Sequence, residues 1–206
     1  DARSWGVLGA ADYLTNFWPL RTIGSSNYCK IHTRQERALI MKTLNTDILV
    51  IGGGSGGLSV AAGAVQMGAR VVLLEGHKMG GDCLNYGCVP SKALLAVAAT
   101  AYGHSAGADM GILPMVPKSD YAKAKDFVAK VVAEIEPHDS VKRFKGLGVQ
   151  VIQEFGHFIS PTEVKAGETV ITARRIVVAT GSGPFVPPIP GLANVPYYTN
   201  ENIFDL

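Results

Sequence analysis

The sequence is poor in cysteine, carries little net charge and has no long apolar run. Three cysteines among 206 residues are too few for the disulfide framework of a small secreted domain. A net charge of +2 gives no electrostatic basis for binding nucleic acid. No uninterrupted apolar run approaches the roughly 18 residues of a membrane span, and the ten-residue run over 93–102 predicts a buried helix instead. We therefore expect neither a nucleic-acid partner nor a membrane partner.

The residues that are present fit a folded α/β protein. Hydrophobic residues make up 47% of the chain and glycines number 24, which is typical of a globular protein and not of a disordered one. The length suffices for one domain, or for one domain with added pieces. One close pair of cysteines and one outlying cysteine suit a reducing compartment, so we expect a cytoplasmic location.

The first 40 residues differ from the rest of the chain. They begin with Asp1, hold both tryptophans and show no sustained helical or strand period. We interpret Met41 as the natural start, residues 1–40 as an extension outside the fold and residues 41–206 as the folded domain. A targeting segment is the alternative, which the arginines of this stretch favour, although it has no clear apolar core or cleavage pattern.

Short apolar runs separated by glycine and proline predict the secondary structure of the remainder. Residues 47–51 and 70–74 predict buried parallel strands, with a helix rich in small residues over 57–68 between them. Pro90 fits the first turn of a helix over 90–102. Further predicted elements are a long amphipathic helix over 119–144 that Pro137 breaks or kinks, and strands over 148–153, 169–172 and 175–179.

A glycine-rich stretch, Gly52-Gly53-Gly54-Ser55-Gly56-Gly57, follows the first predicted strand and satisfies the dinucleotide-binding pattern G-x-G-x-x-G. In this pattern Gly52 makes the tight turn, Gly54 lets a pyrophosphate approach the backbone and Gly57 lets the helix approach the strand. The helix N-terminus receives the phosphate charge. Glu75, at the end of the second strand, is placed to accept from ribose hydroxyls and disfavours a 2′-phosphate, so FAD or NAD is preferred to NADP. The alternative is a glycine-rich turn without a ligand.

A cysteine pair, Cys83 and Cys88, follows the fingerprint by about one βαβ unit. The pair can form a disulfide only if the intervening loop folds back, which Gly87 assists. Cys88 lies at or just before a helix start, where the helix dipole lowers the pKa of a thiol. Cys83 lies in the preceding loop and should be the more accessible thiol. We therefore expect Cys83 to exchange with a substrate and Cys88 to face the cofactor.

Other interpretations of the cysteines are a zinc site, a structural disulfide and two buried, unconnected thiols. Zinc is disfavoured because the spacing is not that of a ligand pair and no second Cys/His pair accompanies it. No metal site is therefore predicted. A structural disulfide would be unusual beside a phosphate-binding loop, which leaves unconnected thiols as the main alternative to redox activity.

The stretch over 80–92, G-G-D-C-L-N-Y-G-C-V-P-S-K, resembles the active-site signature of class I pyridine nucleotide-disulfide oxidoreductases. These flavoproteins include dihydrolipoamide dehydrogenase, glutathione reductase and mercuric reductase. The resemblance covers residues 46–206, and the run over 137–149 is most similar to the mercuric-reductase branch. It implies an α/β, Rossmann-like FAD/NAD(P)-binding domain in three layers, with a parallel sheet and a small added β-meander, here truncated.

The resemblance also implies that the glycine-rich site holds FAD. Catalytic roles would fall to Cys83, Cys88 and Lys92, and Lys92 would stabilise the Cys88 thiolate and a reduced flavin. Ordinary alternatives are a solvated lysine at Lys92 and a strand-end histidine at His157. By position, the pyrophosphate would be held by Gly52, Gly54, Ser55, Gly56 and Gly57, the adenosine ribose by Glu75, and the adenine by Gly156 and His157. Asp82 and Lys92 would lie along the ribityl chain and flavin, and Thr180 with Gly181 would close over the cofactor. Gly81 and Ala179 are also expected to bind the cofactor.

Two residues depart from the family pattern. Asp82 replaces the usual threonine and brings a carboxylate near the pyrophosphate, which requires a compensating hydrogen bond or proton. Tyr86 is bulkier than the residue common at its position. Full-length relatives continue with a second fingerprint for NAD(P)H and with a dimerisation domain carrying a His-Glu acid/base pair. NAD(P)H and a homodimer are therefore expected of the full-length protein.

The resulting functional hypothesis is an FAD-dependent NAD(P)H:disulfide oxidoreductase. Electrons would pass by a ping-pong route between NAD(P)H, the flavin, the cysteine pair and a small-molecule disulfide or metal-ion substrate. The first alternative is a truncated FAD-binding fragment without turnover. The second is another flavoprotein class, such as a monooxygenase or amine oxidase, against which the two cysteines argue because that chemistry needs no dithiol.

Overall fold

The computed structural model describes residues 42–107, 110–113 and 115–206. The predicted extension over 1–40 lies outside the described residues. The strands are β1 (Lys42–Ile51), β2 (Val71–Leu74), β3 (Gln150–Ile152), β4 (Gly156–Ser160), β5 (Glu163–Ala166) and β6 (Thr169–Val178). The helices are α1 (Ser55–Gln66), α2 (Gly81–Asn85), α3 (Cys88–Ser105), α4 (Tyr121–Ile135) and α5 (Val141–Gly146), with 3-10 turns η2 (Glu136–Asp139), η3 (Leu192–Asn194) and η4 (Ile203–Asp205).

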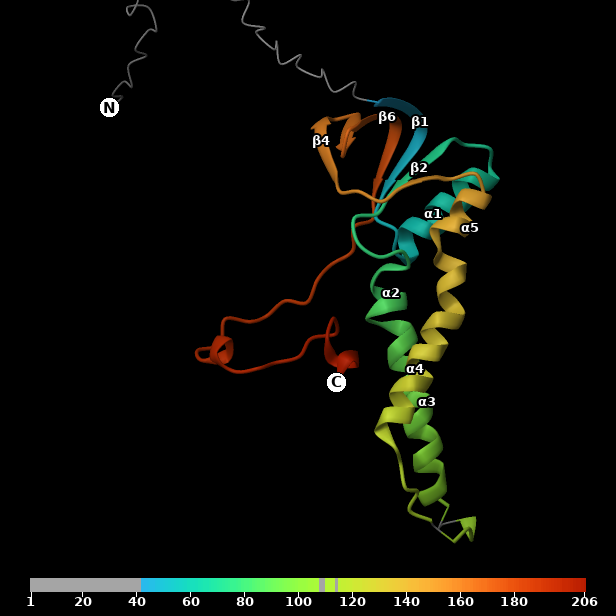
Figure 1. Cartoon of the computed structure of the whole chain (residues 1–206), viewed down its shortest axis with the longest axis vertical. Coiled ribbons are helices and arrows are strands. Elements are labelled where there is room, and N and C mark those ends of the chain that lie inside the picture. Colours follow the sequence, from blue (N-terminus) through green and yellow to red (C-terminus); the bar gives the residue numbers. More distant parts are fainter. Residues whose placement is uncertain (1–41, 108–109, 114) are drawn as a thin grey trace, which may run out of the picture. The chain divides into compact units, whose positions relative to one another are not determined.

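One mixed sheet carries the strands in the order β3-β2-β1-β6-β5-β4 (Figure 1). The pairs β3–β2, β2–β1 and β1–β6 are parallel, whereas β6–β5 and β5–β4 are antiparallel. The parallel part is connected by α1 between β1 and β2, as expected of a βαβ unit. The prediction of an α/β fold with a parallel sheet and an added meander is therefore confirmed.

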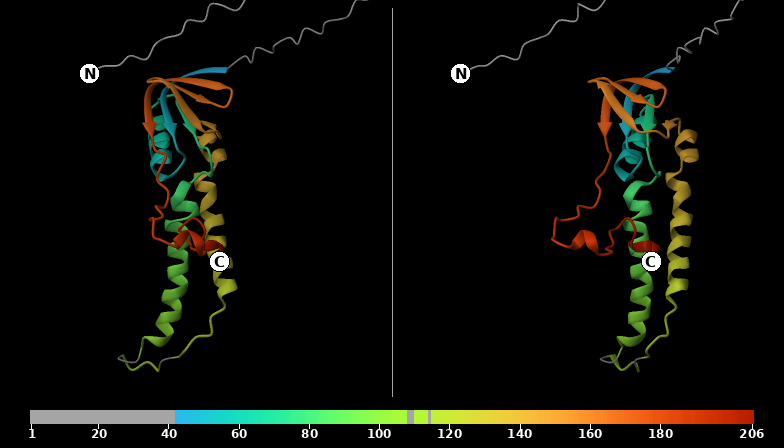
Figure 2. Two further views of the ribbon diagram at one scale, coloured as in Figure 1. Left: turned by 90° about the vertical axis from the view of Figure 1, so that its left-hand side faces the viewer. Right: turned by 60° about the vertical axis from the view of Figure 1, so that its left-hand side comes forward.

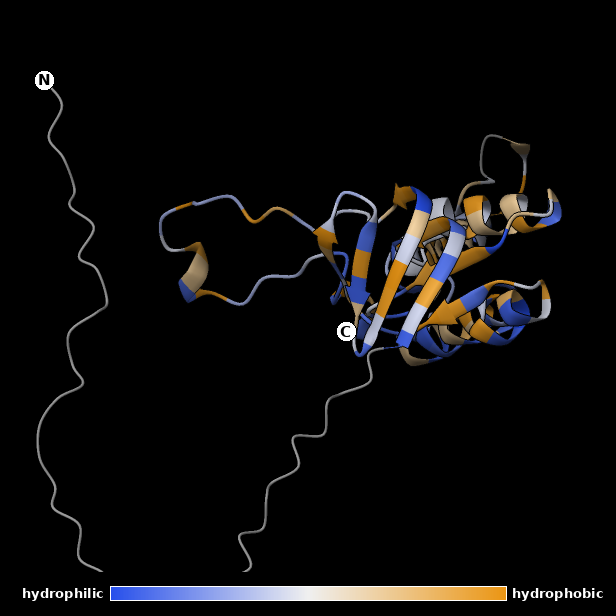
Figure 3. Ribbon diagram, turned by 90° about the horizontal axis from the view of Figure 1, so that it is seen from above, coloured by the Kyte–Doolittle hydropathy of each residue, from blue (hydrophilic) through white to orange (hydrophobic). Residues whose placement is uncertain are grey.

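The two faces of the sheet bury alternate residues of the same strands. On β1, Val50 packs with Leu58 of α1 and Phe144 of α5. Its neighbours Leu49 and Ile51 pack on the opposite face, together with Val164 and other residues of the meander. Figure 3 shows the resulting bands of apolar and polar residues along the strands. All four residues of β2 are buried because β2 is covered on both faces.

The predicted long helix over 119–144 is divided in the structure. α4 ends at Ile135, Pro137 lies in the 3-10 turn η2, and α5 follows, so the prediction of a break at Pro137 is confirmed. The sequence predicts Phe127, Val131, Val132 and Ile135 on the apolar face of this helix. This is only partly right: the last three are half-buried, but Phe127 is 44% exposed and its neighbour Val128 is the buried residue.

The helix predicted over 90–102 is present as α3, but the prediction that residues 93–102 are buried is wrong. α3 and α4 lie side by side (Figures 1 and 2), and α3 also contacts α2, but much of its surface stays uncovered. Leu95 is 66% exposed and Tyr102 is 71% exposed. Among the described helices, none is long and apolar enough to cross a membrane.

Two boundaries of the predicted strands also change. The strands predicted over 169–172 and 175–179 form the single strand β6. The strand predicted from Asp47 begins at Lys42, because residues 42–46 pair in parallel with the first half of β6. This long β1–β6 pairing aligns the two carboxyl ends, at Ile51 and Val178, side by side.

Candidate functional site

A cleft of about 340 Å³ opens at the carboxyl ends of β1, β2 and β6. In the sheet, β2 and β3 lie on one side of β1, and β6 lies next to β1 on the other side. Such a reversal of strand order creates the crevice in which open α/β sheets bind ligands. The lining residues are Gly52, Gly54, Glu75, His77, Lys78, Gly81, Asp82, Tyr86, Ala179, Thr180, Gly181, Ser182 and Glu201.

The turn from β1 into α1 permits only glycine at two positions. Gly52 has φ +110°, and a Cβ there would overlap the Ala179 carbonyl oxygen. A Cβ on Gly57 would overlap the Gly52 carbonyl oxygen. The N–H of Ala179 donates to the carbonyl of Ile51 at 2.8 Å, which joins the ends of β1 and β6. Because these two residues have no side chain, α1, β1 and residues 179–182 can approach one another closely.

Gly54 meets a different requirement. A Cβ at this position would meet no protein atom closer than 3.7 Å, and the backbone angles (φ −82°, ψ −177°) suit any residue. Protein packing by itself therefore does not require glycine here, whereas a phosphate held close to the backbone would. No side chain caps α1, which begins at Ser55, and its first turn, which includes Gly56, contains no acidic residue. This helix end is suited to an anionic group.

Glu75 lines the cleft and holds its surroundings in place by two hydrogen bonds. Its Oε2 accepts a hydrogen bond from the Gly53 N–H at 2.6 Å, and its Oε1 accepts from the His77 N–H at 2.6 Å. The residue is 9% exposed. The carboxyl group therefore holds the glycine-rich loop against the end of β2, and each oxygen keeps a further lone pair for a ligand hydroxyl.

The two cysteines lie on successive helices next to the cleft. Cys83 is in α2, and Cys88 is the first residue of α3. Cys88 is exposed and Cys83 is only partly exposed, so the prediction that Cys83 is the more accessible thiol is wrong for this chain. The reason is local folding: the stretch predicted as a loop forms the short helix α2, beginning after the left-handed Gly80, which turns Cys83 partly inward.

Both thiols are free, and they lie close enough to interact. A hydrogen bond with the Cys88 side chain, together with partial burial, raises the pKa of the Cys83 thiol. The backbone of Cys88 acts in the opposite direction and reduces this rise. The loop between the cysteines therefore does fold back, as a dithiol–disulfide pair requires.

Only some of the predicted site residues line the cleft. Those that do are Gly52, Gly54, Glu75, Gly81, Asp82, Ala179, Thr180 and Gly181. Lys92 is exposed, one turn after Cys88 on α3. Gly156 packs against Leu74 at the start of β4, and His157 is exposed on that edge strand. Lys92, Gly156 and His157 do not line the cleft. Neither Cys83 nor Cys88 lines it.

Five residues of the lining were not predicted. His77 and Lys78 follow Glu75 directly, Tyr86 lies within the cysteine stretch, and Ser182 follows Gly181, so proximity in sequence could have indicated these four. Glu201 lies far along the chain and carries no sequence signal for this place. Its position depends on the path of the C-terminal segment.

The family model described as pyridine nucleotide-disulphide oxidoreductase matches residues 46–205. The chain belongs to this family. The match includes the glycine-rich loop, both cysteines and the segment after β6.

Relatives in the family extend well beyond this chain. Dihydrolipoyl dehydrogenase 2, chloroplastic, of Arabidopsis thaliana is 36% identical over 149 residues, which are 71% of this chain and 26% of the relative. A mercuric reductase of Lysinibacillus sphaericus is 28% identical over 171 residues, which are 83% of this chain and 31% of the relative. The chain thus spans about a quarter to a third of these two relatives.

A solved structure shares the fold. The HOCl-induced flavoprotein disulfide reductase RclA from Escherichia coli superposes with a TM-score of 0.64 and 25% sequence identity, covering 78% of this chain and 34% of RclA.

No group of three or more His, Cys, Asp or Glu side chains suited to a metal ion occurs among the described residues.

Proposed function

We propose that this chain provides the FAD-binding and dithiol part of an FAD-dependent oxidoreductase of its family. Electrons pass between NAD(P)H, a flavin, the cysteine pair and a disulfide or metal-ion substrate. The observation that carries the proposal is the position of α2: Asp82 and Tyr86 line the cleft, and Cys83 lies between them in sequence, on that helix. The thiols therefore lie next to the nucleotide cleft and within reach of each other.

The residues of the cleft fit FAD. A pyrophosphate would lie at Gly54 and the N-terminus of α1, where a glycine that protein packing does not demand faces an uncapped helix end. Glu75 would hold the ribose, and the 179–181 segment would border the cofactor. Bound FAD would supply the capacity to accept a hydride from a nicotinamide cofactor, which cysteine thiols do not have.

The cysteines perform the remaining chemistry by thiol–disulfide exchange. With a disulfide substrate, the thiolate of Cys83 attacks one substrate sulfur, the substrate S–S bond breaks, and the leaving thiolate takes up a proton. Cys88 then attacks Cys83 in the mixed disulfide and releases the second substrate thiol, which leaves the Cys83–Cys88 disulfide. The substrate gains two electrons and the dithiol loses two. The assignment of Cys83 as the attacking thiol requires that a cofactor or another part of the protein cover Cys88, which is exposed here.

The full-length protein is proposed to act as a cytoplasmic homodimer that uses NAD(P)H. These statements are supported by the family membership of the chain. In the two relatives described above, about two thirds or more of the sequence lies outside the part that matches this chain. A mercuric ion is a candidate substrate because several relatives are mercuric reductases. A non-catalytic FAD-binding fragment is the second candidate, favoured by the same partial coverage.

The test is to bind FAD to the 206-residue chain. The chain is mixed with excess FAD, separated by gel filtration and examined for flavin absorbance that elutes with the protein. Gly54→Ala is expected to weaken FAD binding by about tenfold or more, because a Cβ there blocks the approach of the pyrophosphate and meets no protein atom closer than 3.7 Å.

Gly63→Ala is the matched control, since a Cβ at Gly63 on α1 meets no atom within 4 Å. Its FAD binding should equal that of the unchanged chain. A folded unchanged chain that retains no FAD would overturn the cofactor assignment. Equal binding by Gly54→Ala would show that the pyrophosphate lies elsewhere.

A further inference from the structure

A contact from a distant part of the chain reaches the residue directly before the first cysteine of the pair. Asn200 Nδ2 donates a hydrogen bond to Asp82 Oδ1 at 2.7 Å, across 118 positions of the sequence. Asp82 directly precedes Cys83 in α2. The contact therefore links the C-terminal segment, defined here as residues 197–206, to the helix that carries the first thiol.

The other oxygen of the same carboxylate faces the second thiol's helix. A Cβ placed on Gly87 would lie 2.8 Å from Asp82 Oδ2, so this oxygen sits against the Gly87 backbone. Gly87 is the residue before Cys88 and the N-cap of α3. The Asp82 carboxylate thus spans the turn from the residue before one cysteine to the residue before the other.

The C-terminal segment holds Asn200 in a defined place. Its turn is closed by the Thr199 N–H, which donates to Asn202 Oδ1 at 2.7 Å, and by the Ile203 N–H, which donates to the Thr199 carbonyl at 2.9 Å. Further along, Lys125 Nζ of α4 donates to the Asp205 carbonyl at 3.1 Å. The amide of Asn200 is therefore presented to Asp82 by a segment that forms its own turn and that α4 holds at Asp205.

We propose that Asn200 is a positioning residue for the Cys83–Cys88 dithiol, acting through Asp82. By fixing the carboxylate, Asn200 keeps the turn closed and the two thiols near each other, which raises the effective concentration of one thiol for the other and favours the disulfide. The hydrogen bond also offsets the charge of the carboxylate beside the cleft. This inference rests on the proposed redox role of the cysteines and adds a control exerted from the C-terminal segment.

The mutual contact of the thiols supports this view. The hydrogen bond between Cys83 and Cys88, which raises the pKa of the Cys83 thiol, exists only while the turn holds the two side chains together. A looser turn would separate them. The disulfide would then become easier to reduce, although neither cysteine had been changed.

The experiment measures the equilibrium of the dithiol with glutathione. A protein thiolate attacks oxidised glutathione and releases one glutathione thiol, and the second protein thiol then displaces the other, so the dithiol loses two electrons and oxidised glutathione gains them. The chain is used in a Cys29→Ser background so that only two thiols remain. Samples equilibrated at several ratios of reduced to oxidised glutathione are alkylated and weighed by mass spectrometry.

Asn200→Ala is expected to lower the equilibrium constant for the disulfide by about threefold to tenfold, the range of one lost hydrogen bond. Asn194→Ala, an exposed asparagine before the C-terminal segment, is the matched control and should leave the constant unchanged. Asp82→Ala should lower the constant too, and adding Asn200→Ala to it should lower it no further. Circular dichroism spectra of Asn200→Ala should match those of Asn194→Ala, which shows that the fold is retained.

The outcomes separate this inference from the proposed function. A constant for Asn200→Ala equal to that of the unchanged chain overturns the positioning role while the redox pair stands. Additive effects of the two substitutions also overturn it, because Asn200 would then act by a route other than Asp82. A chain that forms no Cys83–Cys88 disulfide at any glutathione ratio overturns the redox role itself, and with it this inference.

Discussion

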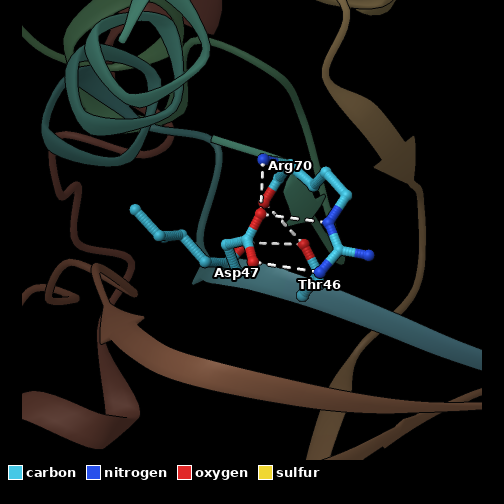
Figure 4. Close-up of polar contacts among 4 residues, drawn as sticks. Thr46, Asp47 and Arg70 are labelled. Atoms are coloured by element: carbon cyan, nitrogen blue, oxygen red, sulfur yellow. Dashed lines mark hydrogen bonds and ion pairs between the residues drawn. The ribbon is translucent and has the colours of Figure 1, made fainter. Parts of the chain in front are cut away.

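The carboxylate of Asp47 and the guanidinium of Arg70 form a bidentate ion pair that joins β1 to the residue directly before β2 (Figure 4). Arg70 Nε donates to Oδ2 and Nη2 donates to Oδ1, each at 3.0 Å, and the Arg70 N–H donates to Oδ2 at 3.0 Å. The Thr46 hydroxyl donates to the Arg70 carbonyl at 2.7 Å. These contacts fix the register of the two strands whose other ends form the cleft.

This ion pair predicts a pH-dependent contribution to stability. The side-chain hydrogen bonds from Arg70 lower the pKa of Asp47 from 3.8 to about 2. A lowered pKa adds stability above the ordinary carboxyl pKa, and that stability is lost as the pH falls through the folded value. The urea midpoint of Asp47→Asn should therefore lie below that of the unchanged chain at pH 7, and the gap should shrink between about pH 4 and pH 2.

Asp126→Asn serves as the control for this comparison, since Asp126 is an exposed carboxylate on α4. Its midpoint should follow that of the unchanged chain at every pH. A gap for Asp47→Asn that stays constant over the whole of that acidic range would show that the ion pair does not contribute in this way.

Two glycines of α1 should respond to alanine in opposite directions. Gly57→Ala should destabilise the chain by about 2 kcal/mol or more, because its Cβ overlaps the Gly52 carbonyl oxygen and forces the helix away from β1. Gly63→Ala, at an exposed position with open space, should stabilise the chain by up to about 1 kcal/mol. Urea denaturation of both variants tests this, and equal stability of the two would refute the close approach of α1.

Removing the carboxylate of Glu75 should loosen the glycine-rich loop. Glu75→Gln places an amide NH₂ where one of two backbone N–H groups now donates, which leaves a donor unpaired at a cost of about 1–3 kcal/mol. FAD binding should weaken as well, because Gly53 and His77 both depend on this side chain. The exposed Glu168→Gln is the control, and a loss of stability equal in both variants would contradict the role assigned to Glu75.

The interaction between the thiols predicts a change in reactivity. The hydrogen bond with Cys88 is the largest cause of the raised pKa of Cys83. Cys88→Ala removes that cause, so the pKa of Cys83 should fall and the fraction of reactive thiolate at a fixed pH near 8 should rise. Iodoacetamide should then label the peptide containing residue 83 faster, as measured by mass spectrometry.

Cys88→Ser replaces the ionisable thiol by a hydroxyl, which can donate a hydrogen bond to the Cys83 thiolate and so favours the charged form. Labelling in Cys88→Ser should therefore also be faster than in the unchanged chain. Labelling in Cys88→Ala that is slower than in the unchanged chain would mean that the contact with Cys88 does not hold the thiol protonated.

Local sequence suffices for the parts of the fold that depend on near neighbours. The turn at Gly52, the presence of a helix after the glycine-rich loop and the break at Pro137 follow from backbone sterics, which act within a few residues. The predicted start of that helix, at Gly57, lies two residues after the observed start at Ser55. The spacing of Cys83 and Cys88 in the sequence likewise indicates a close pair. Prediction fails where neighbours come from elsewhere: a buried helix is expected at α3, yet much of its surface meets no other described element.

The sequence by itself thus determined the βαβ unit, its glycine-rich turn and the closely spaced cysteines, because short-range sterics and periodicity encode them. Only the tertiary structure decided which thiol is exposed, which residues line the cleft together with the glycine-rich loop, and which residue binds the Asp82 carboxylate. Asn200 and Glu201 reach the site through the path of the C-terminal segment, and no local pattern encodes such a contact. Burial and hydrogen-bond partners are properties of packing, so they are fixed only when distant parts of the chain meet.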